Sequence, residues 1–143
     1  RSGTPTVALA CSLALALDKA VTELPARVEH IRALNACLRT GLAKYPKVRI
    51  NSPEGAVPQI LNLSVQNVKG TVFQRELDAR GVCVSVKSAC SSDGLPSRAV
   101  FAVSHDRRNA LSSWRISLSH LTTEQELDDF MQAFDACYST LTQ

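Results

Sequence analysis

The sequence lacks the cysteine spacing that marks disulfide frameworks and zinc sites. Its five cysteines, at positions 11, 37, 83, 90 and 137, include no Cys-x-x-Cys pair. An odd number without that spacing argues against both kinds of site, so we expect no bound metal. Reduced thiols in a cytoplasmic protein fit this cysteine usage best.

Strong charge and a membrane-spanning run are also missing. The formal net charge is only +3 and the basic residues are scattered, so we expect no nucleic-acid partner. The apolar run 7–17 is shorter than the roughly 20 residues needed to cross a bilayer, and it lacks the flanks of a secretory leader. No membrane association is therefore expected. The chain begins at Arg1 without an initiator Met, which leads us to expect a fragment of a longer protein.

What is present predicts one α+β layer. With 143 residues, of which 45% are hydrophobic, the chain can form one compact core. The patterns predict a small, mostly antiparallel sheet with helices packed on one face. The expected strands are 48–50, 60–66, 82–86 and 114–118; the expected helices are 5–22, 25–44, one after Thr71, a short one after Ser97, and one after Thr123.

Two expectations concern burial. The first helix, capped by Thr4 and ended before Pro25, is apolar nearly all round, which predicts that it packs against a missing domain or subunit. Four of the cysteines fall in apolar periodic patterns and are expected to fill the core: Cys11, Cys37, Cys83 and Cys137.

The stretch from Ser88 to Pro96 carries the candidate nucleophile. Its residues are almost all small, it follows the apolar run 82–86, and Cys90 lies in its middle. Loops on rigid scaffolds are where reactive groups usually lie. A lone cysteine is just as often a small buried hydrophobe, so the residues alone leave both interpretations open.

Three motifs in this order resemble one family. They are VSVKSACSS at 84–92, RISL at 115–118 and LTTEQEL at 121–127, and they are similar to the C-terminal part of cysteine desulfurases. These are enzymes of the NifS/IscS type, in the class V aminotransferase group, that depend on pyridoxal phosphate. RSGT at 1–4 and ILNLS at 60–64 also resemble the family, so the likeness covers essentially the whole chain. Lys87 stands where the family usually has Gly, and the segment 93–96 is one residue shorter than usual.

The resemblance implies a fold and a division of the chain. The fold would be the C-terminal small domain of a fold-type I pyridoxal-phosphate-dependent transferase. Residues 1–24 would form a helix that links to the missing large domain, and residues 25–143 would form the small domain. The cofactor lysine would lie before Arg1, because no matching motif occurs here, and this chain alone would be inactive.

The resemblance also implies site residues and partners. Cys90 would be the catalytic nucleophile: as a thiolate it attacks the sulfur of L-cysteine, leaving L-alanine and a persulfide. Arg115 would bind the substrate carboxylate, and its place opposite the apolar face of its strand supports this independently. Thr4 would reach the cofactor phosphate of the partner subunit in a homodimer.

Several alternatives stay open. The persulfide would pass to a sulfur-acceptor or scaffold protein, in iron–sulfur cluster assembly, tRNA thiolation or cofactor synthesis. A related class V enzyme, such as a selenocysteine lyase or an aminotransferase, would share these motifs. A stand-alone sulfur-relay module, with no cofactor, is the third possibility.

Overall fold

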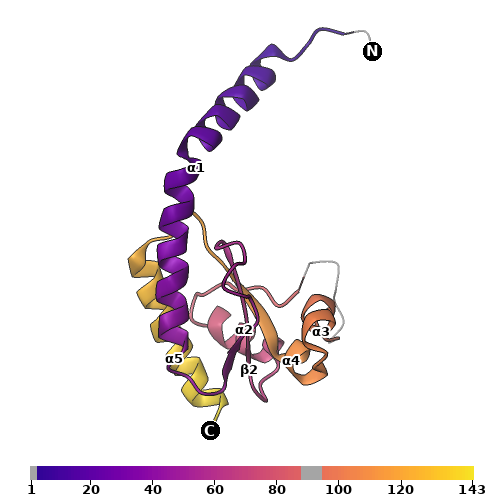
Figure 1. The fold of residues 1–143 in the computed structure, drawn as a ribbon, viewed down its shortest axis with the longest axis vertical. Coiled ribbons are helices and arrows are strands. Elements are labelled where there is room, and N and C mark those ends of the chain that lie inside the picture. Colours follow the sequence, from indigo (N-terminus) through magenta and orange to yellow (C-terminus); the bar gives the residue numbers. More distant parts are fainter. Residues whose placement is uncertain (1–2, 88–94) are drawn as a thin grey trace.

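The described part of the chain forms a three-stranded antiparallel sheet packed with helices, and one long helix projects from this body (Figure 1). The computed structural model describes residues 3–87 and 95–143. The strands lie in the order β1-β2-β3, which confirms the expected α+β class. In chain order the elements are α1 (Val7–Leu42), β1 (Val48–Ile50), β2 (Ile60–Val65), α2 (Gly70–Asp78), α3 (Arg98–Ser104), α4 (Arg107–Ser112), β3 (Ser113–Ser117) and α5 (Glu124–Leu141).

The core lies on one face of the sheet, beneath α2, α5 and the second half of α1. Side chains of a strand alternate between its two faces. The inward-facing positions are therefore apolar, and all are buried as the alternation predicted: Leu61, Leu63, Val65, Trp114 and Ile116. Phe73 of α2 stacks on Trp114 with ring centroids 5.1 Å apart, and Phe134 of α5 tilts against Phe73 at 5.2 Å. This aromatic group joins the two helices to β3.

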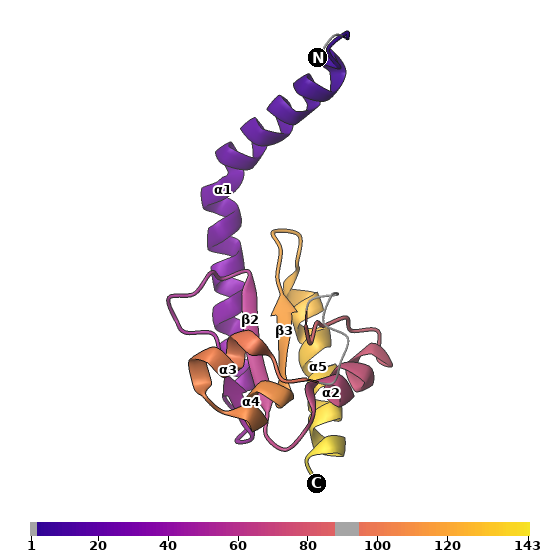
Figure 2. The same ribbon diagram turned by 90° about the vertical axis from the view of Figure 1, so that its right-hand side faces the viewer.

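The opposite, polar face carries the two short helices α3 and α4 (Figure 2). Ser97 caps α3, as its position predicted, because its hydroxyl accepts from the Val100 amide. Asp106 caps α4 by accepting from the backbone amides of Arg108 and Asn109. Asn109 and Ser112 of α4 are buried against the sheet, so this face is partly covered.

The helix α1 corrects two expectations about its length. It is one continuous helix that contains Pro25, and its N-cap is Thr6 rather than Thr4. Proline cannot donate a helical hydrogen bond, and its ring crowds the preceding turn, so a bend is expected there. The helix visibly changes direction between its two halves (Figures 1 and 2).

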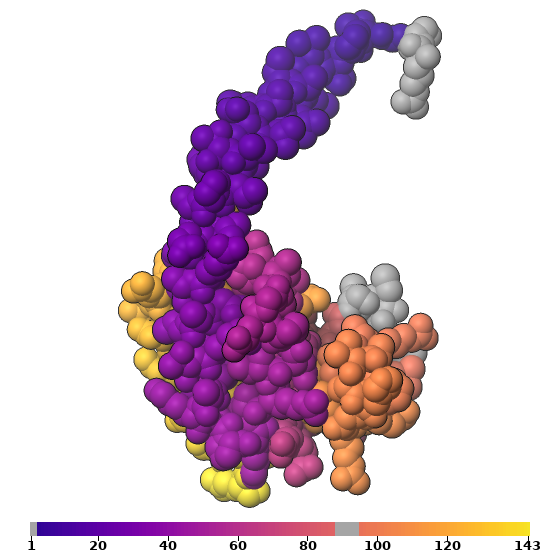
Figure 3. All heavy atoms as spheres, viewed as in Figure 1, coloured from indigo at the N-terminus to yellow at the C-terminus, as the bar shows by residue number. Residues whose placement is uncertain are grey.

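The N-terminal half of α1 is exposed to solvent on all sides. Every side chain from residue 4 to residue 22 is exposed, and Leu13 and Leu15 are 70% and 71% accessible. This half extends away from the rest of the molecule as an arm (Figure 3), and the first buried residue of α1 is Ile31. Within residues 3–87 and 95–143, no helix is both long and apolar enough to cross a membrane.

Three further expectations were wrong in detail. Residues 82–86 form no full strand, because they pair with β3 only at Ser85, which exchanges two backbone hydrogen bonds with Arg115. The helix expected after Thr71 begins at Gly70 with Lys69 as its N-cap, and the side-chain amide of Gln74 donates to the Val84 carbonyl at 2.9 Å. Of the four described cysteines only one is buried: Cys137 lies in the core, whereas Cys11, Cys37 and Cys83 are exposed.

A first prediction concerns Gly70, where α2 meets β3. A Cβ atom on Gly70 would lie 2.5 Å from the carbonyl oxygen of Ser113 and 3.4 Å from Val86 Cγ1. Because the first of these contacts is with backbone, Gly70→Ala should destabilise the fold by about 1–3 kcal/mol. Denaturant unfolding measures this change. The matched control is Gly55→Ala, where nothing lies within 4 Å, and its effect should stay within about 0.5 kcal/mol; equal losses for both variants would contradict the clash.

Candidate functional site

A cleft of about 940 Å³ lies on the polar face of the sheet, bordered by the turn after β1, the start of α3 and residues 86–87. Its described lining contains no carboxylate side chain. Four cationic side chains contribute to it: Arg49, Lys87, Arg98 and Arg115. A cleft lined by one sign of charge favours a ligand of the opposite sign, so this lining suits an anion.

Arg115 is placed in this cleft by strand geometry. It lies between Trp114 and Ile116, which point into the core, so its side chain leaves the sheet on the polar face. The sequence predicted this orientation, and the structure confirms it. The backbone of Arg115 is held at Ser85 by two hydrogen bonds of 2.7 and 3.1 Å. The backbone position from which the Arg115 side chain extends is therefore fixed.

The guanidinium of Arg115 lacks partners within the described part of the chain. Its Nε atom is buried and has no hydrogen-bond acceptor among residues 3–87 and 95–143. No carboxylate of the described residues lies within ion-pair distance of it. A buried donor without an acceptor costs about 1–3 kcal/mol, and more when it is charged. A bound anion that supplied the acceptor would remove this cost. Trp114 Nε1 is also unpaired, but it lies on the core side of the sheet.

The candidate nucleophile Cys90 lies outside the described residues. The described residues on either side of the gap, Lys87 and Leu95, both line the cleft. Cys90 is three positions from Lys87 and five from Leu95 in the sequence. Cys137 is a poor alternative nucleophile, because burial raises the pKa of its thiol and it lies in the core.

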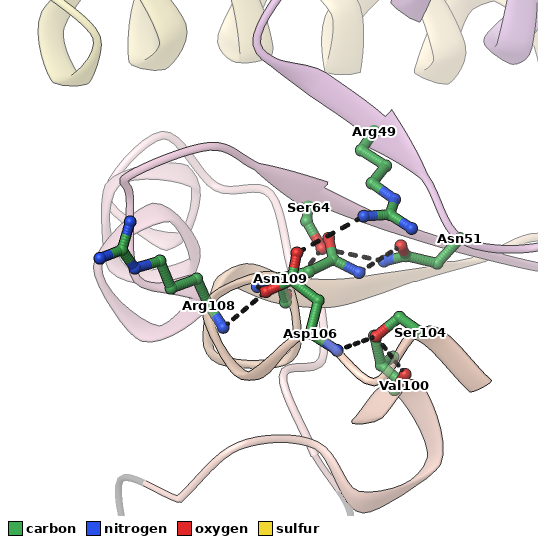
Figure 4. A network of polar contacts seen from close by, with 8 residues as sticks. All are labelled: Arg49, Asn51, Ser64, Val100, Ser104, Asp106, Arg108 and Asn109. Atoms are coloured by element: carbon green, nitrogen blue, oxygen red, sulfur yellow. Dashed lines mark hydrogen bonds and ion pairs between the residues drawn. The ribbon is translucent and has the colours of Figure 1, made fainter. Parts of the chain in front are cut away.

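A polar network holds Asn51, which lines the cleft, and sequence reasoning missed this network (Figure 4). Asn51 Nδ2 donates to Ser64 Oγ at 2.8 Å, and Asn109 Nδ2 donates to Asn51 Oδ1 at 2.9 Å. Ser64 in turn donates to the Asn109 carbonyl at 3.0 Å. The alternation of β2 placed Asn62 and Ser64 on the polar face, but their partners come from distant segments that no local pattern identifies.

Thr4, the candidate cofactor-binding residue, is exposed just before α1. That end of α1 projects away from the sheet (Figure 1), so this chain does not bring Thr4 and Arg115 together. The N-cap Thr6 makes no side-chain hydrogen bond to the helix. The first turn of α1 therefore has no capping acceptor from Thr6, and such a turn can receive an anion.

Comparison with known proteins gives consistent results. The family model described as Aminotransferase class-V matches residues 1–130. A protein of Cronobacter sakazakii named cysteine desulfurase IscS is 35% identical over 130 residues, which are 90% of this chain and 32% of that protein. Another of that name, from Clostridium botulinum, is 29% identical over 90% of this chain and 34% of its own length.

Solved structures agree with the sequence comparison. A structure titled NIFS-like protein superposes with a TM-score of 0.81 and 32% identity, over 99% of this chain and 36% of the other. A NifS-like protein from Rickettsia africae gives a TM-score of 0.78 with 28% identity, over 97% and 36%. The chain thus spans about a third of the length of the relatives that it matches.

Proposed function

The chain belongs to the class-V aminotransferase family, and from this premise we propose that it is the C-terminal part of a cysteine desulfurase that depends on pyridoxal phosphate. Residues 1–24 would connect to a large domain that binds most of the cofactor, and residues 25–143 would be the small domain. The bare apolar surface of the N-terminal half of α1 supports this division, because such a surface requires a cover.

The proposed reaction transfers the sulfur of L-cysteine to Cys90. The Cys90 thiolate would attack the substrate sulfur, so that an S–S bond forms as the substrate C–S bond breaks. The products are L-alanine and a persulfide on Cys90, which then passes its outer sulfur to an acceptor protein. The observation that carries the proposal is the buried Nε of Arg115, which has no acceptor among the described residues and lies in a cationic cleft that suits the carboxylate of an amino acid.

The residues present here fit only one part of the cofactor. The exposed Thr4 hydroxyl and the uncapped first turn of α1 suit a phosphate group. When bound, pyridoxal phosphate would supply an electron sink for the amino acid substrate. Because Thr4 lies far along the arm from the cleft, we place it at the active site of a partner subunit, in a homodimer. The four described cysteines are free thiols, which fits a protein of the reducing cytoplasm.

The test of this function is a product assay on the full-length protein. With L-cysteine as substrate, it should release one L-alanine for each sulfur delivered, and it should show the yellow colour of bound pyridoxal phosphate. The 143-residue chain alone should release none, because it holds no candidate cofactor lysine motif. Turnover of selenocysteine alone would identify a lyase instead. Sulfur uptake by a colourless full-length protein would identify a relay module.

A further inference from the structure

Asn62 of β2 lies directly opposite Arg115 of β3 in the antiparallel register. The two residues exchange no ladder hydrogen bonds. The backbone of Arg115 bonds Ser85 on its other side, and the Asn62 carbonyl accepts from the amides of Asn51 and Ser52. In an antiparallel pair of this kind the Cα atoms approach to about 4.5 Å and the side chains lie closest together. Both side chains leave on the polar face and line the cleft.

The orientation of the Asn62 amide is determined by its neighbours. Its Oδ1 accepts from Asn51 Nδ2 at 2.8 Å, and the same Asn51 amide is held by Ser64 and Asn109. The oxygen of Asn62 is therefore committed to Asn51. Its two Nδ2 hydrogens are left as donors, and among the described residues they have no acceptor.

We infer that Asn62 is a second specificity-determining residue for the substrate carboxylate, acting beside Arg115. A carboxylate offers about four lone-pair positions, so a guanidinium that binds it in a bidentate manner leaves other lone pairs without a donor. Asn62 Nδ2 donates to one of them, and the fixed amide cannot turn its oxygen toward the anion. This inference rests on the proposed function, because it names the group that the cleft recognises.

Two substitutions in the full-length protein separate this role from a structural one. Asn62→Asp keeps an oxygen that can accept from Asn51 but replaces the donors with a second, negatively charged oxygen. It should raise the KM for L-cysteine and the dissociation constant of L-alanine by about a hundredfold, with a smaller change in kcat. Asn62→Ala removes the donors without adding charge, so both constants should rise about tenfold.

The readouts are steady-state turnover of L-cysteine, calorimetric titration with L-alanine, and thermal unfolding. Wild-type KM and L-alanine affinity in a folded Asn62→Asp protein would overturn the inference and leave the proposed function intact. If the wild-type protein binds L-alanine without turning over L-cysteine, and Asn62→Asp weakens that binding, then the role of Asn62 in carboxylate binding is supported and the proposed reaction is wrong. If the wild-type protein neither binds L-alanine nor turns over L-cysteine, the proposed function and the role of Asn62 are both wrong.

Discussion

Replacing Cys90 by alanine in the full-length protein should lower sulfur transfer from L-cysteine by roughly three orders of magnitude or more. The step needs a thiolate that can form an S–S bond, and no hydroxyl can take its place. The neighbouring serines at 88, 91 and 92 therefore offer no substitute. The measurement is persulfide on the protein, detected by mass spectrometry after incubation with L-cysteine and without added thiol.

The matched control for this experiment is Cys83→Ser. Cys83 is exposed and lies seven residues upstream, so its thiol is accessible to reagents. It does not line the cleft, and its removal should leave turnover unchanged. Persulfide that persists at wild-type level in the Cys90→Ala protein, or that disappears in the Cys83→Ser protein, would assign the sulfur to another residue.

The sequence was most informative where a local rule determines the structure. The two-residue period placed Leu61 and Leu63 in the core and Arg115 on the opposite face, because a strand has only two faces. The helix expected after Thr123 is α5, and Thr123 and Glu126 form a capping box at its start, whose two hydrogen bonds depend only on residues three apart. The class of the fold follows from elements of this kind.

The predictions that failed depended on tertiary context. Pro25 usually ends a helix, yet α1 continues through it with a bend. Residues 82–86 have the composition of a strand, but the Val84 carbonyl is taken by Gln74, and only Ser85 reaches β3. Cys11 lies in an apolar pattern and is still exposed, because the N-terminal half of α1 does not pack against the core of this chain.

Only part of the candidate site could be predicted from the sequence. Arg115 could be placed by strand period, and the resemblance gave it a role. The donors of Asn62 could not be found from the sequence, because they depend on the register between β2 and β3. They also depend on Asn51, which Asn109 of α4 holds from 58 positions away. Local periodicity in the sequence does not reveal such long-range hydrogen bonds.

Replacing Arg115 by alanine should reduce kcat/KM for L-cysteine by a factor between about a hundred and ten thousand. The variant loses two charge-assisted hydrogen bonds to the carboxylate, each worth about 1.5–3 kcal/mol. Arg115→Lys keeps the charge but loses the planar fork, so its loss should be intermediate. L-cysteinamide, which has no carboxylate, should be turned over no better by the wild-type protein than by the alanine variant.

Stability and activity should separate at this residue. Because the buried Nε of Arg115 has no acceptor in the described part of the chain, its removal takes away an unpaired donor, and the free energy of unfolding should be unchanged or higher. Arg98→Ala is the matched comparison: it removes an exposed arginine of α3 that lines the same cleft, and its loss of activity should be much smaller than that of Arg115→Ala. Equal losses of activity in the two variants would mean that the cleft attracts its ligand through net charge alone. A marked loss of stability in the Arg115→Ala protein would mean that the guanidinium holds the sheet rather than the substrate.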